Sequence, residues 1–342
     1  MQPDTVTISH VSEKAGVSKT TVSRYINGKF EHMSTETKDR IKAVIEELDY
    51  RPSAIARGLK SQKTGLIGVI LSDMTNPVMA QLIKGIMDCS TPEGYQVVTV
   101  SSDETSAKER EYILSMTDRQ VEGLIVVIAD SNEFSFLESL QAKGVNIVLA
   151  DRTINKPIFD MVTTDNYAIT KHTIKTLYGL GFEAVGLFSS DLLKSNVRLA
   201  RHNAFLNQSK EYVDNPTDLV YIIRGNSEDD YKQALVDFMA KCAGKKAAAF
   251  ASTPMATLNL LTAAHALGLS IPEDLGICGY DNLHWTRLIG GGISVVEQPI
   301  YEVGFESANL LIKRIRGEID DGPKYIELNS KLILRASTNG GR

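Results

Sequence analysis

The sequence has few of the residues that build disulfide frameworks or zinc sites. Its 342 residues include three cysteines, Cys89, Cys242 and Cys278, which are far apart and form no Cys-x-x-Cys pair. We therefore expect three reduced and mostly buried thiols. No apolar run approaches the ~18 residues that a membrane helix requires, and residues 1–4 lack the basic and apolar regions of a secretory signal. These absences predict a cytoplasmic protein without a membrane partner.

Signatures of common enzyme classes are missing as well. The chain has no Walker A motif, no G-x-S-x-G motif, and no G-x-G-x-x-G motif after its first expected strand. The run Gly290-Gly291-Gly292 is better explained as a loop than as a phosphate-binding turn. A carboxylate pair for glycoside hydrolysis stays open, because spacing alone does not test it. We predict a protein that is not an enzyme and that has no catalytic residue, metal or cofactor.

Charge is distributed unevenly along the chain. Residues 1–63 carry 11 basic and 8 acidic side chains, a net charge of +3, whereas the remainder carries 26 and 34, a net charge of −8. The length predicts two or three domains, and 43% apolar with 23% charged residues is an ordinary globular composition. The asymmetry favours a small nucleic-acid-binding part attached to an acidic body.

Three short helices are expected within the first fifty residues. Thr7 is a suitable N-cap for the first helix, and Gly16 suits the turn that ends it because glycine tolerates a positive φ. Ser18 then caps a second helix over residues 19–27, and Ser34 caps a third. The apolar positions recur at helical spacing. The expected core consists of Val11, Ala15, Val22, Ile26, Ile41, Val44, Ile45 and Leu48.

This arrangement is typical of a helix-turn-helix, whose second helix fits the major groove of DNA. On that helix Arg24 can bind guanine through its forked guanidinium, Lys19 can donate to guanine or phosphate, and Thr20 can contact a base edge. A second group of polar residues suits phosphate contacts, which set the register on DNA. The predicted DNA-binding set is completed in the headpiece by Thr7, Ser18, Thr21, Ser23 and Asn27. A small helical bundle with a solvated polar face is the alternative.

The residues that carry these features resemble the headpiece of the lactose/galactose-repressor (LacI/GalR) family. The match runs through TISHVSEKAGVSKTTVSRYING at 7–28 and STETKDRI at 34–41, and it ends with LDYRPSAIARGL at 48–59. The resemblance implies a DNA-binding headpiece over residues 1–50. It also implies a hinge helix over residues 51–63, which folds in the minor groove at the centre of the operator.

The hinge supplies the minor-groove contacts that the resemblance implies. Ala56 would lie near the floor of the groove, and Leu59 would insert between the central base pairs, as apolar wedges do. Tyr50, Ser53 and Arg57 would contact the DNA backbone and groove. The family usually has asparagine where this chain has Ser53. Serine retains a hydroxyl and lacks the amide, so we expect this contact to be weaker.

From residue 64 onward, apolar runs alternate with helical stretches. This alternation is typical of βαβ units and a parallel sheet. Strands are expected in two series, at 66–71, 96–100, 124–129 and 147–150, and then at 185–189, 220–223, 247–251 and 276–280. Two such series predict two α/β lobes. Residues 293–298 and 326–334 suggest crossovers between the lobes.

The predicted fold class is an N-terminal all-α helix-turn-helix headpiece followed by an α/β core of two parallel-sheet lobes, like a periplasmic binding protein. The core covers residues 64–342 and is expected to bind the effector and to dimerise. Its lobes are discontinuous in sequence. The N-lobe is expected at about 64–166 and 298–326, and the C-lobe at about 167–297 and 327–342.

Polar residues follow five of the expected strands, at the end where open parallel sheets bind their ligands. Their carboxylates, amides and guanidinium groups suit a polyhydroxylated ligand, whose hydroxyls both donate and accept hydrogen bonds. Any one of them could instead cap a strand, so the prediction depends on the agreement of all five ends. These residues are Ser72, Asp73, Asn76, Asp151, Arg152, Arg198, Arg201, Ser252, Thr253, Asp281 and Asn282.

The core also resembles the LacI/GalR family, in blocks such as DMTNPV at 73–78 and GYDN at 279–282. The resemblance implies that Asp151, Arg201 and Asp281 contact the effector. It also places part of the pocket wall on the N-lobe. The other members of the expected effector site are Asp73, Asn76, Val78, Arg198, Ser252 and Gln298.

A departure from the family pattern bears on the charge of the ligand. Residues 252–256 read STPMA in place of the usual N-D-x-M-A block, which removes an amide and a negative charge near the pocket. Basic residues expected nearby are Arg152, Lys194, Arg198 and Arg201. We therefore favour a sugar acid or a phosphorylated sugar over a neutral sugar as the small-molecule effector. The blocks GYDNLHW and EQPIYE loosely resemble ketodeoxygluconate-type regulators, and Trp285 either closes the pocket or packs in the core.

The resemblance implies a homodimer that binds a pseudo-palindromic operator in double-stranded DNA and represses carbohydrate-utilisation genes. A ligand in the cleft would change the angle between the lobes, and so decide whether the two hinges meet. Two alternatives are a catabolite regulator controlled by a phosphoprotein partner and a sugar-binding transport protein. The transport protein would need a signal peptide and no helix-turn-helix, the reverse of what this sequence has.

Overall fold

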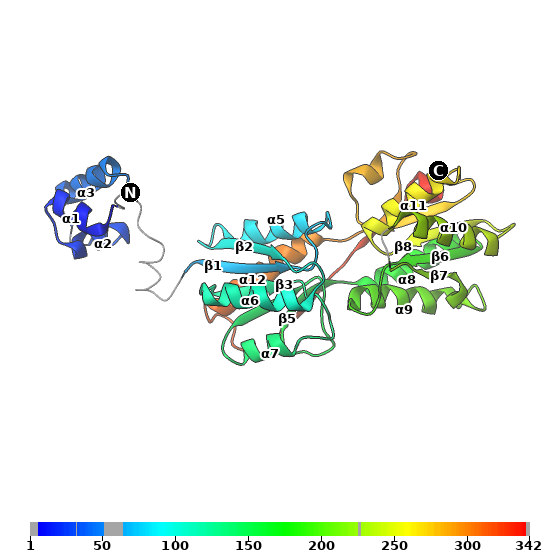
Figure 1. Ribbon diagram of the computed structural model, residues 1–342, viewed down its shortest axis with the longest axis horizontal. Helices are drawn as coiled ribbons and strands as arrows, with labels where there is room; N and C mark the ends of the chain where they lie inside the picture. The colour runs from blue at the N-terminus through cyan, green and yellow to red at the C-terminus, as the bar shows by residue number, and fades with distance from the viewer. Residues whose placement is uncertain (1–5, 32, 51–63, 225–226, 340–342) are drawn as a thin grey trace. The chain divides into compact units, whose positions relative to one another are not determined.

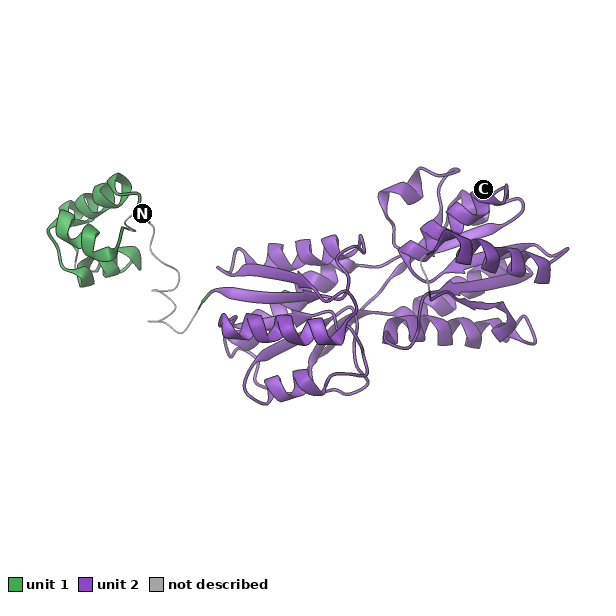
Figure 2. Ribbon diagram, viewed as in Figure 1, with its two compact units in different colours: residues 1–64 green, residues 65–342 purple. Residues whose placement is uncertain are grey.

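The chain forms two compact units, residues 1–64 and residues 65–342 (Figure 2). Each unit has its own hydrophobic core and is described by itself. In this computed structural model, the described residues are 6–31, 33–50, 64–224 and 227–339.

The first unit is a bundle of three helices, α1 (Ile8–Ala15), α2 (Lys19–Ile26) and α3 (Thr35–Glu47) (Figure 1). Gly16 ends α1 with a φ of 63°, a left-handed conformation that glycine adopts without steric cost. The hydroxyl of Ser18 accepts a hydrogen bond from a backbone N–H in the first turn of α2 and so caps that helix. The helices bury Val11, Ala15, Val22, Ile41 and Val44. The apolar spacing in the sequence predicts this packing.

The first sheet of the second unit has the strand order β11-β5-β4-β3-β1-β2, and every strand is parallel to its neighbours. We call the part of the chain built on this sheet the N-lobe. Its strands are β1 (Leu66–Leu71), β2 (Gln96–Ser101), β3 (Gly123–Val126), β4 (Asn146–Ala150), β5 (Asp160–Thr164) and β11 (Tyr325–Leu328). Strand β5 lies where the apolar pattern predicts no strand.

The second sheet has the corresponding order β12-β10-β9-β8-β6-β7 and forms the basis of the C-lobe. Its strands are β6 (Ala184–Ser189), β7 (Val220–Ile222), β8 (Ala247–Ala251), β9 (Gly276–Tyr280), β10 (Ser294–Glu297) and β12 (Lys331–Ile333). All pairs are parallel except that β12 runs antiparallel to β10. The predicted fold class is confirmed, with one antiparallel edge strand that the sequence pattern does not indicate.

The chain crosses between the two sheets at three places (Figure 1). It passes from β5 through helix α8 (Asn166–Gly179) to β6, and it returns from β10 through helix α12 (Ile300–Ile315) to β11. The third crossing connects β11 to β12. The carboxyl ends of β5 and β10 therefore lie where the lobes join.

Helices cover both sheets. The N-lobe carries α12 together with α5 (Met79–Ser90), α6 (Ser106–Asp118) and α7 (Ser135–Gln141). The C-lobe carries α8 together with α9 (Asn196–Ser209), α10 (Glu228–Lys241), α11 (Pro254–Ala266), α13 (Ala336–Asn339) and the short 3-10 helices η1 (Pro216–Leu219) and η2 (His284–Arg287). Among the described residues, no helix is long and apolar enough to cross a membrane.

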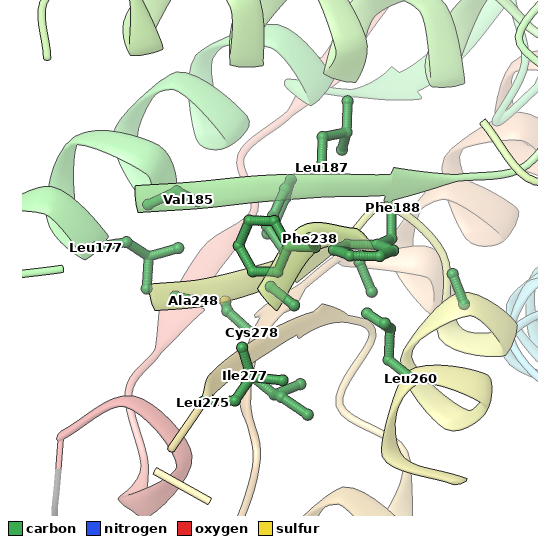
Figure 3. Packing of buried hydrophobic residues seen from close by; sticks show 14 of the residues in the cluster. Leu177, Val185, Leu187, Phe188, Phe238, Ala248, Leu260, Leu275, Ile277 and Cys278 are labelled. Carbon is green, nitrogen blue, oxygen red and sulfur yellow. The ribbon is translucent and has the colours of Figure 1, made fainter. Parts of the chain in front are cut away.

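Aromatic side chains fill part of the C-lobe core (Figure 3). Phe238 of α10 packs edge-on against Phe188 of β6, with ring centroids 5.6 Å apart. Gly186 makes room for this contact, because a Cβ at that position would lie 2.6 Å from the Phe238 ring. Cys278 is buried in the same core, and all three cysteines are free and buried, as the sequence predicts.

Helices α5 and α12 approach each other closely in the N-lobe. An added Cβ at Gly85 of α5 would lie 2.0 Å from the carbonyl oxygen of Tyr301 in α12. Gly304 of α12 makes the reciprocal approach, because its Cβ would lie 2.1 Å from the carbonyl oxygen of Leu82 in α5. The neighbours at both positions are backbone atoms, which cannot move aside as a flexible side chain can.

Gly85→Ala is expected to destabilise the core, because the methyl group would force the two helices apart. We expect the free energy of unfolding to fall by about 1–3 kcal/mol, as in other overpacked sites. Urea denaturation measures this change. Gly179→Ala at the end of α8 is the matched control, since a Cβ there meets no atom within 4 Å and alanine favours helix. Equal stability of the two variants would contradict the close helix crossing.

Candidate DNA-binding surface and effector site

Helix α2 presents three polar side chains to solvent. Lys19, Thr20 and Arg24 are exposed, whereas Val22 between them is fully buried in the core of the headpiece. Thr20 and Arg24 are four residues apart and therefore share one face of the helix. A hydroxyl, an ammonium and a guanidinium group are thus free to contact a partner, which is the arrangement that reading of base edges requires.

The other predicted DNA contacts of the headpiece lie at the helix ends. The Oγ of Ser18 and the Oγ1 of Thr21 are 2.9 Å apart, and Asn27 Nδ2 donates to the carbonyl oxygen of Ser23 at 2.7 Å. Thr7 is exposed at the start of α1. These hydrogen bonds hold the ends of α2 in place. The phosphate contacts of these residues stay predictions.

Only the first of the predicted hinge contacts is described. Tyr50 is partly buried against the core of the headpiece. The other residues of this set, Ser53, Ala56, Arg57 and Leu59, lie outside the described residues. Their minor-groove contacts stay predictions.

Two buried aspartates follow corresponding strands of the two sheets. Asp151 follows β4 and Asp281 follows β9, with φ angles of 63° and 68°. The backbone N–H of each donates to the neighbouring strand, to Val162 at 2.9 Å and to Val296 at 2.7 Å. Burial raises the pKa of Asp281 to about 6 and also raises the pKa of Asp151. A carboxylate in such a place is stabilised by any hydrogen-bond donor that a ligand brings.

Arg201 of α9 connects three segments of the chain. It is 4% exposed, and its Nε donates to Asn166 Oδ1 at 2.8 Å. Nη1 donates to the carbonyl oxygen of Ser252 at 2.6 Å, and Nη2 donates to Gln298 Oε1 at 2.9 Å. The guanidinium also lies 3.7 Å from the centre of the Tyr280 ring. The orientation of its planar guanidinium group is therefore fixed.

Gln298 links Arg201 to Asp281 across the junction of the lobes. Its Nε2 donates to Asp281 Oδ1 at 2.8 Å, and its Oε1 accepts from Thr164 Oγ1 at 2.9 Å. Thr164 ends β5 of the N-lobe, whereas Asp281 follows β9 of the C-lobe. One amide side chain thus contacts both lobes.

A second cluster joins the lobes through charge. Glu104 follows β2, and its Oε1 accepts hydrogen bonds from Arg152 of the N-lobe and, at 2.5 Å, from Arg198 of α9. Burial raises the pKa of Glu104, but Arg152 and Arg198 outweigh burial and leave that pKa below its ordinary value. Burial and the nearby Arg152 lower the pKa of Arg198. Two guanidinium groups therefore share one carboxylate.

Polar contacts at the rim also connect the lobes. Asn196 at the start of α9 accepts hydrogen bonds through Oδ1 from Ser131 Oγ and from the backbone of Thr153, both at 3.2 Å. The backbone N–H of Ser131 donates to Lys194 at 3.0 Å. These neutral contacts hold the two lobes together at one edge.

A cavity of about 350 Å³ includes Asp281 and Gln298 in its wall. The cavity is lined by Val78, Gln81, Asp281, Asn282, Glu297, Gln298, Pro299, Tyr301, Glu302, Asn329 and Lys331. Asp73 and Asn76, also predicted on the wall, are not among the residues that line this cavity, and both accept hydrogen bonds within the loop before α5. Asp73 Oδ1 accepts from the Thr75 backbone at 2.8 Å, and Asn76 Oδ1 accepts from the Val78 backbone at 3.3 Å.

The structure thus brings most of the predicted effector residues to the junction of the lobes. Arg201, Gln298 and Asp281 are directly hydrogen-bonded, and Ser252 takes part through its carbonyl oxygen, while its hydroxyl donates to Ser189. Arg198 belongs to the charged cluster instead. The role of each residue in binding a ligand stays a prediction. Among the described residues, no group of acidic, histidine and cysteine side chains could hold a metal ion.

Sequence reasoning missed three residues of the site. Glu104 follows β2, so the rule that strand ends bind ligands would have found it if that strand had been included. Nothing in the sequence pattern indicates the hydrogen bonds of Thr164 and Asn166. Trp285 is partly buried and packs against the cores of both lobes.

Comparison with known proteins finds relatives over nearly the whole length of the chain. The family model for bacterial regulatory proteins of the lacI family matches residues 7–53, and the model for a periplasmic binding protein-like domain matches residues 174–338. The chain is 36% identical to the HTH-type transcriptional regulator KdgR of Bacillus subtilis (strain 168), over 97% of each chain. It is 30% identical to catabolite control protein A of Priestia megaterium, over 97% of this chain and 99% of the relative.

Solved structures share the fold at lower sequence identity. The lac repressor dimer bound to operator and the anti-inducer ONPF superimposes with a TM-score of 0.83 at 21% identity, covering 98% of this chain and 99% of that chain. The transcriptional regulator CelR in complex with cellobiose gives a TM-score of 0.70 at 23% identity, covering 97% and 99%. The structures show the fold, and the sequence relatives show the family: this chain belongs to the LacI family of bacterial regulatory proteins.

Proposed function

We propose that this chain is a cytoplasmic repressor of carbohydrate-utilisation genes, whose binding to operator DNA is controlled by an acidic sugar held between its lobes. The observation that carries the proposal is the buried guanidinium of Arg201, hydrogen-bonded at the junction of the lobes, together with a second arginine cluster beside it. The ligand is bound and released unchanged, so no catalytic step belongs to this function.

The headpiece is proposed to read the operator with helix α2. Lys19, Thr20 and Arg24 would contact base edges in the major groove, and the net charge of +3 over residues 1–63 would add attraction to the phosphates. Leu59 of the hinge is proposed to enter the minor groove. A homodimer would bind two half-sites of a pseudo-palindrome.

The charge of the site supports an acidic ligand. Arg152, Arg198 and Arg201 lie close enough together for all three to influence the pKa of the buried Asp151. A guanidinium binds a carboxylate or a phosphate through parallel charge-assisted hydrogen bonds. Asp281 supplies an acceptor for sugar hydroxyls on the C-lobe side. A sugar acid or a sugar phosphate has both kinds of group.

The contacts that cross between the lobes provide the link to DNA binding. A ligand that replaces hydrogen bonds of Gln298 or Arg201 changes which angle between the lobes is most stable. In a dimer, that angle sets the distance between the two hinges. A coupling of about 1–3 kcal/mol is enough to change operator occupancy severalfold or more.

A second candidate function is that of a catabolite regulator whose DNA binding depends on a phosphoprotein partner. The 30% identity with a catabolite control protein over nearly the whole chain supports this alternative. It differs from the first candidate in a measurable way, because small ligands alone would then leave operator binding unchanged.

Arg24→Ala should remove sequence preference more than it weakens general affinity, because the guanidinium is proposed to contact base edges. We expect a loss of about 1–3 kcal/mol on the specific duplex, measured by gel shift on the gene's own upstream region. A random duplex of equal length should be affected much less. Lys42→Ala, which removes one charge from an exposed site on α3, is the control. Equal loss on both duplexes for Arg24→Ala would contradict base reading.

A ligand panel tests the chemistry of the effector. We expect uronic acids, aldonic acids or sugar phosphates to raise the Tm and to change the gel shift, and Arg201→Met to abolish both effects. Stabilisation by neutral hexoses alone would contradict the acidic ligand. Normal operator binding with no response to any compound would favour the phosphoprotein partner.

Asp281→Asn should change how stability depends on pH. The variant retains the oxygen that accepts from Gln298 and removes the charge. The pKa of Asp281 is about 6 in the folded chain, against 3.8 for an ordinary aspartate. The folded state therefore binds the proton more tightly, and the wild type loses stability as the pH rises between these two values. The loss is on the order of 3 kcal/mol by pH 7, and the variant does not suffer it.

Urea denaturation at intervals between pH 4 and pH 7 measures this difference. The stability of Asp281→Asn relative to wild type should increase over the window, while its affinity for ligand falls. Asp118→Asn, which removes a carboxylate at the exposed end of α6, is the control. A flat difference for Asp281→Asn would show that its carboxylate is not held in a water-poor site.

A further inference from the structure

The cluster around Glu104 contains an internal anion. A single oxygen, Glu104 Oε1, accepts hydrogen bonds from Arg152 and Arg198, which belong to different lobes. The side chains of these arginines are only 7% and 14% exposed, whereas that of Glu104 is 32% exposed. A carboxylate from the protein thus lies between two nearly buried guanidinium groups, and it is the more accessible partner.

Both arginines are held by hydrogen bonds that do not involve Glu104. Arg152 Nη1 donates to the carbonyl oxygens of Ile128 and Ala129 at 3.3 and 3.2 Å. Arg198 Nη1 donates to the carbonyl oxygen of Asp191 at 3.0 Å. The Nη2 groups are the ones that bind Glu104. If the carboxylate left, the pair would keep its position and present two donors to another anion.

Glu104 itself lies on a backbone that other contacts must hold in place. Asp103 and Glu104 have φ angles of 51° and 53°, a left-handed conformation that is unfavourable for residues with a side chain. The N–H of Glu104 donates to the Ser72 carbonyl at 2.6 Å. Such a conformation persists only where its surroundings enforce it, and the ion pairs with the arginines are part of those surroundings. The loop can relax when the arginines bind a different anion.

We propose that Glu104 is an internal competitor for the anionic group of the ligand, and that the ligand's carboxylate or phosphate takes its place on Arg152 and Arg198. This inference rests on the proposed function for the class of ligand. The exchange replaces one anion by another, so both guanidinium groups keep an anionic partner. A neutral sugar offers no such replacement, and Glu104 thereby makes the site selective for acids.

Chemical rescue tests the anion site without the natural ligand. Glu104→Ala should lower the Tm of the full-length protein, and formate should restore part of the loss because it carries the missing carboxylate. At constant ionic strength, exchange of chloride for formate should raise the Tm of the variant by about 2–4 °C and that of the wild type much less. The double variant Glu104→Ala/Arg198→Ala, which retains one of the two donors, should show a clearly smaller rescue. An equal response of all three proteins would overturn the anion site.

The exchange is tested by calorimetric titration of Glu104→Gln, which fills the same space without the charge. The probes are D-galacturonate, D-gluconate and glucose 6-phosphate, with D-galactose and D-glucose as neutral controls. At least one acid should bind the variant about tenfold more tightly than the wild type, because the internal competitor is gone. The neutral sugars should show no gain.

The results that would contradict the exchange differ from those that would contradict the proposed function. If every acid binds Glu104→Gln and the wild type equally, or binds neither, the exchange is overturned. Weaker binding of the acids to Glu104→Gln would show that Glu104 contacts the ligand directly, which also overturns the exchange. If only neutral sugars act on operator binding while formate still rescues Glu104→Ala, the proposed function fails and the anion site stands.

Discussion

The burial of Arg201 is the constraint on which the effector site depends. A guanidinium carries a positive charge and several N–H donors, so its burial requires acceptors for those donors. Those acceptors are Asn166 at the start of α8, Ser252 after β8 and Gln298 after β10. Three segments that are distant in sequence are thus fixed around one charge. The position of Asp281 follows from this arrangement, since Gln298 binds both it and the guanidinium.

The two sheets have the same strand order, yet the two sides of the site differ in charge. Burial raises the pKa of Asp151, and the three arginines around it oppose that rise without cancelling it. Asp281, at the corresponding position in the other sheet, binds the amide of Gln298, and its pKa reaches about 6. The site therefore has one basic side and one side rich in acceptors. A sugar acid has the same asymmetry, which would fix its orientation.

Local periodicity predicts the elements whose buried face is visible in their own sequence, such as the three headpiece helices and the apolar strands. Strand β5 is missed because it begins with Asp160, a charged residue in a buried strand. Arg314 binds this carboxylate at 2.8 and 2.9 Å from 154 residues away, and the backbone N–H of Lys324 donates to it at 2.7 Å. The antiparallel direction of β12 is also not visible in its own sequence, because it depends on how the chain crosses from β11 to the second sheet. In the site, the ends of the expected strands predict where the carboxylates lie. Their hydrogen-bond partners cannot be predicted in this way, because the tertiary fold brings them from distant parts of the sequence. Glu104, for example, is 48 and 94 residues from its two arginines.

With an exchange of anions, the contacts that select the ligand would differ from the contacts that set the angle between the lobes. Leaving a buried charge without its partner costs about 3–5 kcal/mol, more than the ~1–3 kcal/mol typical of allosteric coupling. If the ligand restores the charge pairing, this large cost is avoided. The free-energy difference between the two lobe angles then depends only on the remaining contacts between the lobes. Those contacts include the hydrogen bonds of Gln298 and the neutral contacts of Asn196 with Ser131 and Thr153. The size of the response would then depend on these polar contacts, whereas the arginines determine which ligand is accepted.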